Sequence, residues 1–133
     1  MNTNRKILLV DDEQEFREIT GKFLLRRNLE SLQAENCMAA LDLLGQRERE
    51  VDVIVMDVSM PGMDGISCMA EIKKSWPDKE VIILTGHASL QVSISGMKKG
   101  ASDYCMKPVN YTELLEKILL AKKEFFHKQE DTA

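Results

Sequence analysis

Long hydrophobic runs are absent from this sequence, which excludes the simplest ways of being held in a membrane. The chain has 133 residues, 44% of them hydrophobic, and its apolar residues fall into short runs. A membrane-spanning helix needs about 20 predominantly apolar residues in a row, and a secretory signal needs a longer apolar core than the run that follows Lys6. The sequence therefore predicts a cytoplasmic protein with no membrane partner.

A surplus of basic residues is also absent. The 18 lysines and arginines are outnumbered by 22 aspartates and glutamates, which gives a net charge of -4 at pH 7. Proteins that bind nucleic acid through their own surface need a clustered basic face. We therefore expect no direct contact with nucleic acid.

Closely spaced cysteines are missing as well. The three cysteines, Cys37, Cys68 and Cys105, are an odd number, and no two of them are near each other in the sequence. Metal-binding knuckles and small disulfide frameworks both rely on short, paired cysteine spacings. This pattern predicts three free, buried thiols, which agrees with a cytoplasmic location.

What the sequence does contain is a regular alternation of short apolar runs with longer segments of helical periodicity. The apolar runs predict strands at Lys6–Val10, Ser31–Glu35, Val53–Asp57, Val81–Thr85 and Ser102–Met106. The segments after them predict helices at Glu13–Arg27, Met38–Gln46, Ile66–Ser75, Leu90–Lys99 and Thr112–Lys128. Three of the runs are almost continuously apolar, as is typical of parallel strands covered on both faces.

The last predicted helix carries two local signals. Asn110, three residues before Glu113, resembles a capping box at the start of the helix. An inward-facing apolar stripe follows at helical spacing, formed by Leu114, Ile118, Ala121 and Phe125. The adjacent Phe126 must point elsewhere, which leaves open a contact with a partner or a second copy.

Five strand-then-helix units predict an α/β fold with right-handed crossovers. We expect a (βα)5 flavodoxin-like, doubly wound parallel sheet of five strands in the order 2-1-3-4-5, with helices on both faces. The length suits a single domain over residues 1–128, followed by a polar C-terminal tail at residues 129–133. In such sheets the binding site lies beyond the carboxyl ends of the strands, where the strand order reverses.

Acidic residues stand at the ends of the first and third predicted strands. Asp11 and Asp12 follow the first strand, and Asp57 ends the third. Two carboxylates about 4 Å apart repel each other by roughly 4 kcal/mol at an effective dielectric constant near 20. If the strand order is as expected, this cluster needs a cation.

Two more polar residues close neighbouring strands. Thr85 ends the fourth apolar run, and Lys107 follows the fifth, directly before Pro108. Each of these residues alone fits an ordinary solvated loop or a helix cap. Together with the three aspartates, however, they predict a chemical site at one edge of the sheet.

These stretches resemble the signature of a known family. The motifs are Val10-Asp11-Asp12, Asp57 with the later Met60-Pro61-Gly62-Met63-Asp64-Gly65, Leu84-Thr85-Gly86, and Lys99-Gly100-Ala101-Ser102-Asp103-Tyr104 leading to Lys107-Pro108. In this order they are similar to the two-component response regulator receiver domain, from about Lys6 to the last helix.

The resemblance implies a phosphoacceptor site. Asp57 would take a phosphoryl group from a sensor histidine kinase or a phosphotransfer protein, or from a small donor such as acetyl phosphate. Mg2+, or Mn2+ in its place, would be held directly by Asp12 and Asp57, by Asp11 through a water molecule, and by the backbone carbonyl of Ser59. Lys107 and Thr85 would contact the phosphoryl oxygens.

The resemblance also implies how the signal would leave the site. Thr85 and Tyr104 would form a switch pair, and Ser59 and His87 occupy positions that tune the lifetime of the phosphorylated state. The changing surface would be formed by residues 90–99, 102–106 and 112–128. It would serve a downstream protein, an output domain missing from this sequence, or a dimer. A cis peptide before Pro108 is also implied, although most X-Pro bonds are trans.

Other functions remain to be weighed against this one. A flavodoxin-like flavin binder would share the fold, but the acidic segment from Asp11 to Glu15 would repel the phosphate of a flavin. A phosphatase of the haloacid dehalogenase type would need Asp-x-Asp after the first strand, and Glu13 breaks that pattern. A degenerate receiver that only binds partners is disfavoured by the complete set of site residues. A stand-alone regulator and the receiver of a longer transcription factor both remain open.

Overall fold

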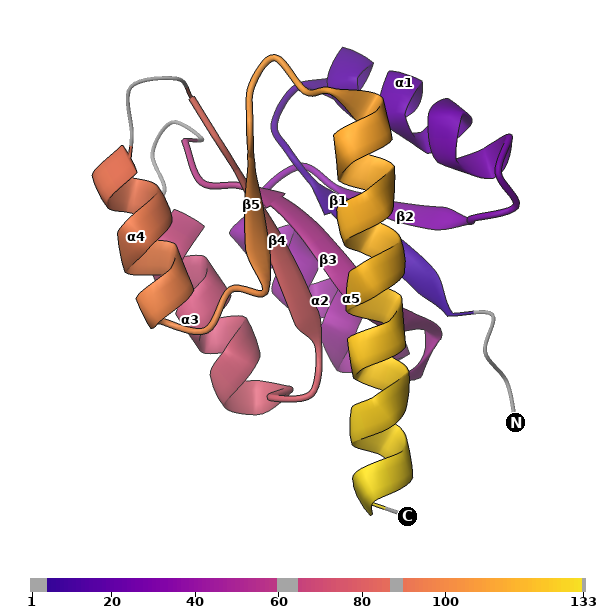
Figure 1. Ribbon diagram of the computed structural model, residues 1–133, viewed down its shortest axis with the longest axis vertical. Coiled ribbons are helices and arrows are strands. Elements are labelled where there is room, and N and C mark those ends of the chain that lie inside the picture. Colours follow the sequence, from indigo (N-terminus) through magenta and orange to yellow (C-terminus); the bar gives the residue numbers. More distant parts are fainter. Residues whose placement is uncertain (1–4, 60–64, 87–89, 133) are drawn as a thin grey trace.

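The chain alternates strands and helices as the sequence predicts (Figure 1). The computed structural model describes residues 5–59, 65–86 and 90–132. The strands are β1 (Lys6–Val10), β2 (Ser31–Ala34), β3 (Val51–Asp57), β4 (Glu80–Thr85) and β5 (Asp103–Met106). The helices are α1 (Gln14–Leu25), α2 (Cys37–Arg47), α3 (Gly65–Ser75), α4 (Leu90–Lys98) and α5 (Tyr111–Thr132), with a 3-10 turn, η1, at Glu48–Glu50.

The strands form one parallel sheet in the order β2-β1-β3-β4-β5, which confirms the predicted topology. Its centre is β3, which pairs with β1 on one side and β4 on the other. Val10 of β1 is level with Met56 of β3, so Asp11 and Asp57 both follow at the same edge. The reversal of strand order therefore lies between the two strands that carry the acids, where ligands bind in open sheets of this kind.

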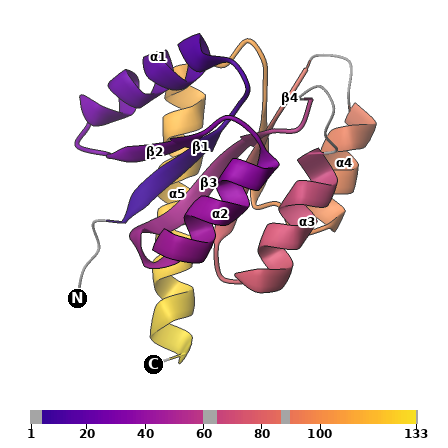
Figure 2. The ribbon, with the colours of Figure 1, turned by 180° about the vertical axis from the view of Figure 1, so that it is seen from behind.

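Helices cover both faces of the sheet (Figure 2), and a layer of buried hydrophobic residues lies between the sheet and the helices on each face. On one face, alternate residues of the central strands, such as Leu8, Ile54 and Ile83, pack with buried residues of α2 and α3. On the other face, the intervening residues, such as Val55 and Ile82, pack with α1 and α5. Successive side chains of a strand point to opposite faces, so the nearly continuous apolar runs of β3 and β4 supply both layers at once.

The last helix begins and packs as predicted. The amide of Glu113 donates a hydrogen bond of 3.0 Å to the side chain of Asn110. All four residues of the predicted inward stripe are buried, namely Leu114, Ile118, Ala121 and Phe125. The peptide bond between Lys107 and Pro108 is cis, as the resemblance implied.

The helix α5 continues to Thr132, four residues beyond the predicted end at Lys128. Two buried acids, at the amino ends of β3 and β4, bind lysines of α5. Lys122 donates to both carboxylate oxygens of Asp52 at 3.1 and 3.0 Å, and Lys128 pairs with Glu80. These contacts join residues far apart in sequence, so helical periodicity alone does not reveal them. No helix among the described residues is long and apolar enough to span a membrane.

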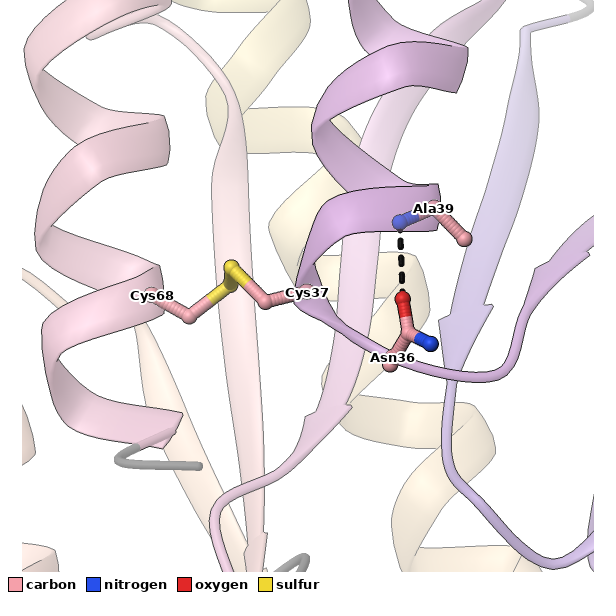
Figure 3. The surroundings of a disulfide bond; sticks show 4 residues. All are labelled: Asn36, Cys37, Ala39 and Cys68. Carbon is pink, nitrogen blue, oxygen red and sulfur yellow. Dashed lines mark hydrogen bonds between the residues drawn. A yellow bond between two sulfur atoms is a disulfide. The ribbon is translucent and has the colours of Figure 1, made fainter. Parts of the chain in front are cut away.

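The prediction of three free cysteines is wrong. Cys37, the first residue of α2, is disulfide-bonded to Cys68 of α3, and their Cα atoms are 6.0 Å apart (Figure 3). The two residues are separated by 31 positions, and only the packing of α2 and α3 on the same face of the sheet brings them together. The prediction was correct for Cys105, which is free and buried.

Candidate functional site

Three aspartates converge where β1 and β3 end. Asp11 and Asp57 are almost completely buried, whereas Asp12 is exposed. One carboxylate oxygen from each of the three residues lies within 4.8 Å of the others. Oxygen ligands at this spacing can hold a hard divalent cation, so the predicted acidic cluster is present and suits a metal.

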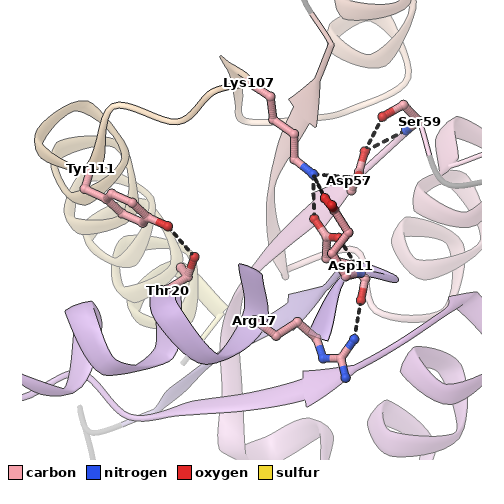
Figure 4. A network of polar contacts seen from close by, with 8 residues as sticks. Asp11, Arg17, Thr20, Asp57, Ser59, Lys107 and Tyr111 are labelled. Atoms are coloured by element: carbon pink, nitrogen blue, oxygen red, sulfur yellow. Dashed lines mark hydrogen bonds and ion pairs between the residues drawn. The ribbon is translucent and has the colours of Figure 1, made fainter. Parts of the chain in front are cut away.

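Lys107 reaches into this cluster from the segment after β5. Its Nζ atom donates to Asp57 Oδ2 at 2.9 Å and to Asp11 Oδ2 at 2.9 Å (Figure 4). A third oxygen, Oε1 of the exposed Glu13, lies 3.4 Å from the same ammonium. The lysine therefore bridges two buried carboxylates and partly offsets the repulsion between them.

The carboxylate of Asp57 is held on both of its oxygens. Its Oδ1 atom accepts hydrogen bonds from the Ser59 hydroxyl at 2.6 Å and the Ser59 amide at 2.8 Å, while Oδ2 faces Lys107. Burial alone would raise the pKa of Asp57, but the hydrogen bonds from Ser59 and Lys107 outweigh it and the pKa is lowered. The structure therefore favours the ionised form of Asp57 at neutral pH.

Asp11 has the opposite balance. Burial raises the pKa of Asp11 above its usual value, and the charge of Asp57 adds to this rise. The hydrogen bonds from Lys107 and the Glu13 amide, together with the charge of Lys107, lower the pKa but offset the effect of burial only in part. The Glu13 amide donates to Asp11 Oδ1 at 2.9 Å, and Arg17 donates to the Asp11 backbone carbonyl at 2.7 Å. These bonds fix the turn that carries Asp11 and Asp12 at the start of α1.

The ammonium of Lys107 is strongly favoured in this setting. Burial lowers the pKa of Lys107, but its hydrogen bonds to Asp11 and Asp57 and their charges raise it further, and the net shift is upward. The ammonium also lies 4.8 Å from the centre of the Phe16 ring. The lysine therefore carries a fixed positive charge against the carboxylate of Asp57.

Thr85 and Tyr104 lie on neighbouring strands and on the same face of the sheet. Tyr104 is level with Ile83 in the β4–β5 pairing, and Thr85 is two residues further along β4. Thr85 is buried, and its hydroxyl donates to the Gly86 carbonyl at 3.3 Å. Tyr104 is half-buried and packs against the layer of α2 and α3. The predicted switch pair is thus adjacent, with Thr85 at the same edge as the acids.

The remaining predicted positions divide into two groups. Ser59 contacts Asp57 directly through its side chain and its amide. His87 and the motif residues 60–64 lie outside the described residues.

The comparison with protein families identifies this arrangement. The family model for the response regulator receiver domain matches residues 7–119, which is most of the chain. The chain belongs to this family. Receiver domains are the signalling phosphoacceptor modules of two-component systems.

Several relatives of this receiver domain are response regulators. The chain is 34% identical over 119 residues to a putative response regulator of Rickettsia bellii that is described as NtrX-like, covering 88% of this chain and 24% of the relative. It is 32% identical over 124 residues to the DNA-binding transcriptional regulator NtrC of Escherichia coli, covering 93% of this chain and 25% of that protein. The receiver domain thus spans about a quarter of the length of these relatives.

Solved structures show the same fold. The CheY-like response regulator receiver domain protein of Methanospirillum hungatei superposes with a TM-score of 0.85 at 30% identity. The match covers 93% of this chain and 98% of that one.

Sequence reasoning missed three residues that support the site of this receiver domain. Glu13, Phe16 and Arg17 all lie at the start of α1, next to the acidic turn. The weak signal available was their position, because the first turn of a helix after a strand faces the same edge as the strand end. None of them belongs to the motifs that carry the resemblance.

Proposed function

We propose that this receiver domain accepts a phosphoryl group on Asp57 from the phosphohistidine of a sensor kinase or of a phosphotransfer protein. The observation that carries the proposal is the position of Lys107, whose ammonium bridges the buried carboxylates of Asp57 and Asp11 at 2.9 Å. A buried, ionised carboxylate beside a fixed cation is suited to attack phosphorus while the charge that develops on the phosphoryl oxygens is neutralised.

The transfer exchanges one bond to phosphorus for another. An oxygen of Asp57 forms a bond to phosphorus, and the bond from phosphorus to the donor, an imidazole nitrogen or the oxygen of acetyl phosphate, breaks with its electron pair leaving on the donor. The product is an acyl phosphate, which water later hydrolyses to the carboxylate and inorganic phosphate. Lys107 can move its ammonium from the carboxylate oxygen to a phosphoryl oxygen as the negative charge shifts, without losing its proton.

Asp11, Asp12 and Asp57 are suited to hold Mg2+ or Mn2+, with the carbonyl of Ser59 as a further ligand. The fit is supported by their oxygens, which lie within 4.8 Å of one another, and by the exposure of Asp12, which leaves room for retained water. When bound, the divalent ion would supply positive charge beside Asp57 in addition to that of Lys107. Lys107, which is itself held by Asp11, fixes the position of Oδ2 of Asp57.

Thr85 and Tyr104 are our candidates for the switch. Thr85 directly follows Leu84, which is level with Asp57 in the β3–β4 pairing. Its hydroxyl would therefore turn from Gly86 toward a phosphoryl oxygen, and Tyr104 would fill the space it leaves on the same sheet face. The expected output surface carries exposed apolar residues, namely Ile94, Met97, Met106, Leu119 and Leu120. We propose that a protein partner, an output domain or a second copy binds there, in the cytoplasm.

Incubation of the chain with acetyl phosphate and Mg2+ tests the proposal. We expect intact-mass spectrometry to show one added phosphoryl group, peptide mapping to place it on Asp57, and the signal to disappear in Asp57→Asn and with a chelator. Asp42→Asn, at an exposed position of α2, is the matched control that should keep full phosphorylation. Absence of an Asp57-dependent mass gain would overturn the assignment.

A further inference from the structure

The disulfide joins two helices that the phosphoacceptor chemistry does not itself require to be linked. Cys37 opens α2 and Cys68 lies in α3, and the bond closes a ring that contains the whole of β3 with Asp57 (Figure 3). The third thiol, Cys105, is buried in the opposite layer of the protein. The fold therefore selects which cysteines pair. Cys37 and Cys68 lie in the layer of α2 and α3 and form the disulfide, whereas Cys105 lies in the layer of α1 and α5.

The two cysteine residues differ in exposure. Cys68 is 3% exposed, whereas Cys37 is only partly buried at the surface end of α2. Cys37 is also the first residue of its helix, where unpaired backbone amides favour negative charge. A small thiol or disulfide from solvent therefore reaches Cys37 first, because thiol exchange depends on access and on the thiolate form.

Cys105 offers a contrast within the same chain. It is 1% exposed, and burial raises the pKa of its thiol to about 11. A buried thiol of this kind is inert toward oxidants in the folded protein.

The disulfide bond also lies near the end of β3, the strand that carries Asp57. A side chain at Gly65, in the same turn of α3 as Cys68, would approach within 2.4 Å of Val58 Cα and 3.1 Å of the Asp57 carbonyl oxygen. The first turn of α3 is therefore closely packed against the end of β3. Cys68 sits three residues further on, so the disulfide fastens to α2 the part of α3 that touches the end of the strand.

We propose that Cys37 and Cys68 form a reversible dithiol–disulfide pair that exchanges with a small-molecule disulfide such as oxidised glutathione, with Cys37 as the entry thiol and Cys68 as the resolving thiol. The Cys37 thiolate attacks one sulfur of the small disulfide, and one glutathione leaves as a thiolate. Cys68 then attacks the sulfur of Cys37, and the second glutathione leaves. The two protein thiols are oxidised by two electrons, the small disulfide is reduced to two thiols, and the protons of the cysteines pass to them.

Equilibration of the full chain with glutathione buffers of varied ratio tests this pair. After acid quenching, denaturation and alkylation, peptide mapping should show the two thiols disappearing together as oxidised glutathione increases, while Cys105 remains a free thiol throughout. The pair needs neither phosphorylation of Asp57 nor a metal, so its failure and the failure of the proposed function are distinguishable.

Single variants test the order of exchange. In Cys68→Ser a glutathione adduct should accumulate on Cys37, and in Cys37→Ser the adduct on Cys68 should form roughly tenfold more slowly. Native Cys105 must stay unreactive in both variants, which reports that each is folded. The proposal is overturned if Cys37 and Cys68 stay reduced at every ratio, or if the folded variants acquire adducts at equal rates.

Discussion

The ammonium of Lys107 lies 2.9 Å from Oδ2 of Asp57 and at the same distance from Oδ2 of Asp11, although the lysine is 50 residues from the first acid and 96 from the second. One cation thus serves two almost fully buried carboxylates. Its side chain is only 21% exposed, so water screens this contact less than an ordinary surface ion pair. The relationship makes the ionisation of both acids depend on one residue.

Replacing Lys107 by methionine should raise the pKa of Asp57 and raise that of Asp11 further. Lys107 lowers both pKa values through hydrogen bonds and charge, and its loss leaves only the bonds from Ser59 to Asp57 and from the Glu13 amide to Asp11 to oppose burial. Carbon NMR of the labelled carboxyl groups in metal-free buffer measures both titrations, which belong to the pair as a whole. Lys123→Met, which removes the same charge from an exposed position of α5, should leave them unchanged. Unchanged midpoints in Lys107→Met would contradict the bridging role.

Ser59→Ala should be less stable than the original chain at neutral pH, and the gap between them should narrow as the pH falls below the ordinary pKa of Asp57 near 3.8. The pKa of Asp57 is lowered in the folded state, so this group stabilises the fold above its ordinary value near 3.8 and loses that contribution as the pH falls through the lower folded value. Without the Ser59 hydroxyl the folded pKa rises toward the ordinary one, and the contribution shrinks.

Urea unfolding at neutral pH and at a pH below 3.8 measures the difference between Ser59→Ala and the original chain. Ser75→Ala, at the exposed end of α3, is the control for loss of a serine hydroxyl. If the stability gap between Ser59→Ala and the original chain were the same at both pH values, the hydroxyl would not be setting the pKa of Asp57.

The strand ends were predictable because they depend on local composition and on the rules of parallel sheets. Apolar runs of five residues located β1 without error and β4 to within one residue, and the strand order then brought Asp11, Asp57 and Lys107 to one edge. The motifs then predicted which family the chain resembles, because their residue types match the chemistry of the site.

Contacts between distant segments were not predictable in the same way. The bond between Cys37 and Cys68 depends on how α2 and α3 are placed over the sheet, and no spacing in the sequence encodes that placement. The end of α5 likewise makes contacts that helical periodicity does not encode, from Lys128 to Glu80 of β4 and from Gln129 to Asp78. Such features arise from tertiary packing, which overrides the local signals of a polar segment.

Gly65→Ala should destabilise the junction between β3 and α3. The added Cβ would lie 2.4 Å from Val58 Cα, a backbone atom that cannot move without shifting the strand, so we expect a loss of about 3 kcal/mol or more. Gly45→Ala in α2 meets nothing within 4 Å and should stabilise the helix by about 0.5–1 kcal/mol. Thermal and urea unfolding of the two variants measure this contrast.

Because α3 begins at this junction, phosphorylation is a second readout for Gly65→Ala. The variant should accept the phosphoryl group of acetyl phosphate more slowly than Gly45→Ala under conditions where both remain folded. Equal stability of the two variants would show that the close approach of Gly65 to Val58 is easily relieved.

Lys122→Met should destabilise the fold because it leaves a buried acid without its cation. Asp52 is 4% exposed, and Lys122 donates to both of its carboxylate oxygens and to the backbone carbonyl of Arg5. Breaking one side of a buried ion pair typically costs about 3–5 kcal/mol, since the remaining charge stays desolvated. Urea unfolding measures the loss, with Lys123→Met as the exposed control on the same helix.

The double variant Asp52→Asn, Lys122→Met separates the cost of the unpaired charge from the loss of the contact itself. Removing the charge of Asp52 as well should recover part of the stability lost in Lys122→Met, since a neutral amide is less costly to bury than a carboxylate. If the two changes were additive, the acid and the lysine would be acting independently. In that case the helix α5 would owe its position past Ala121 to apolar packing of Phe125 rather than to this pair.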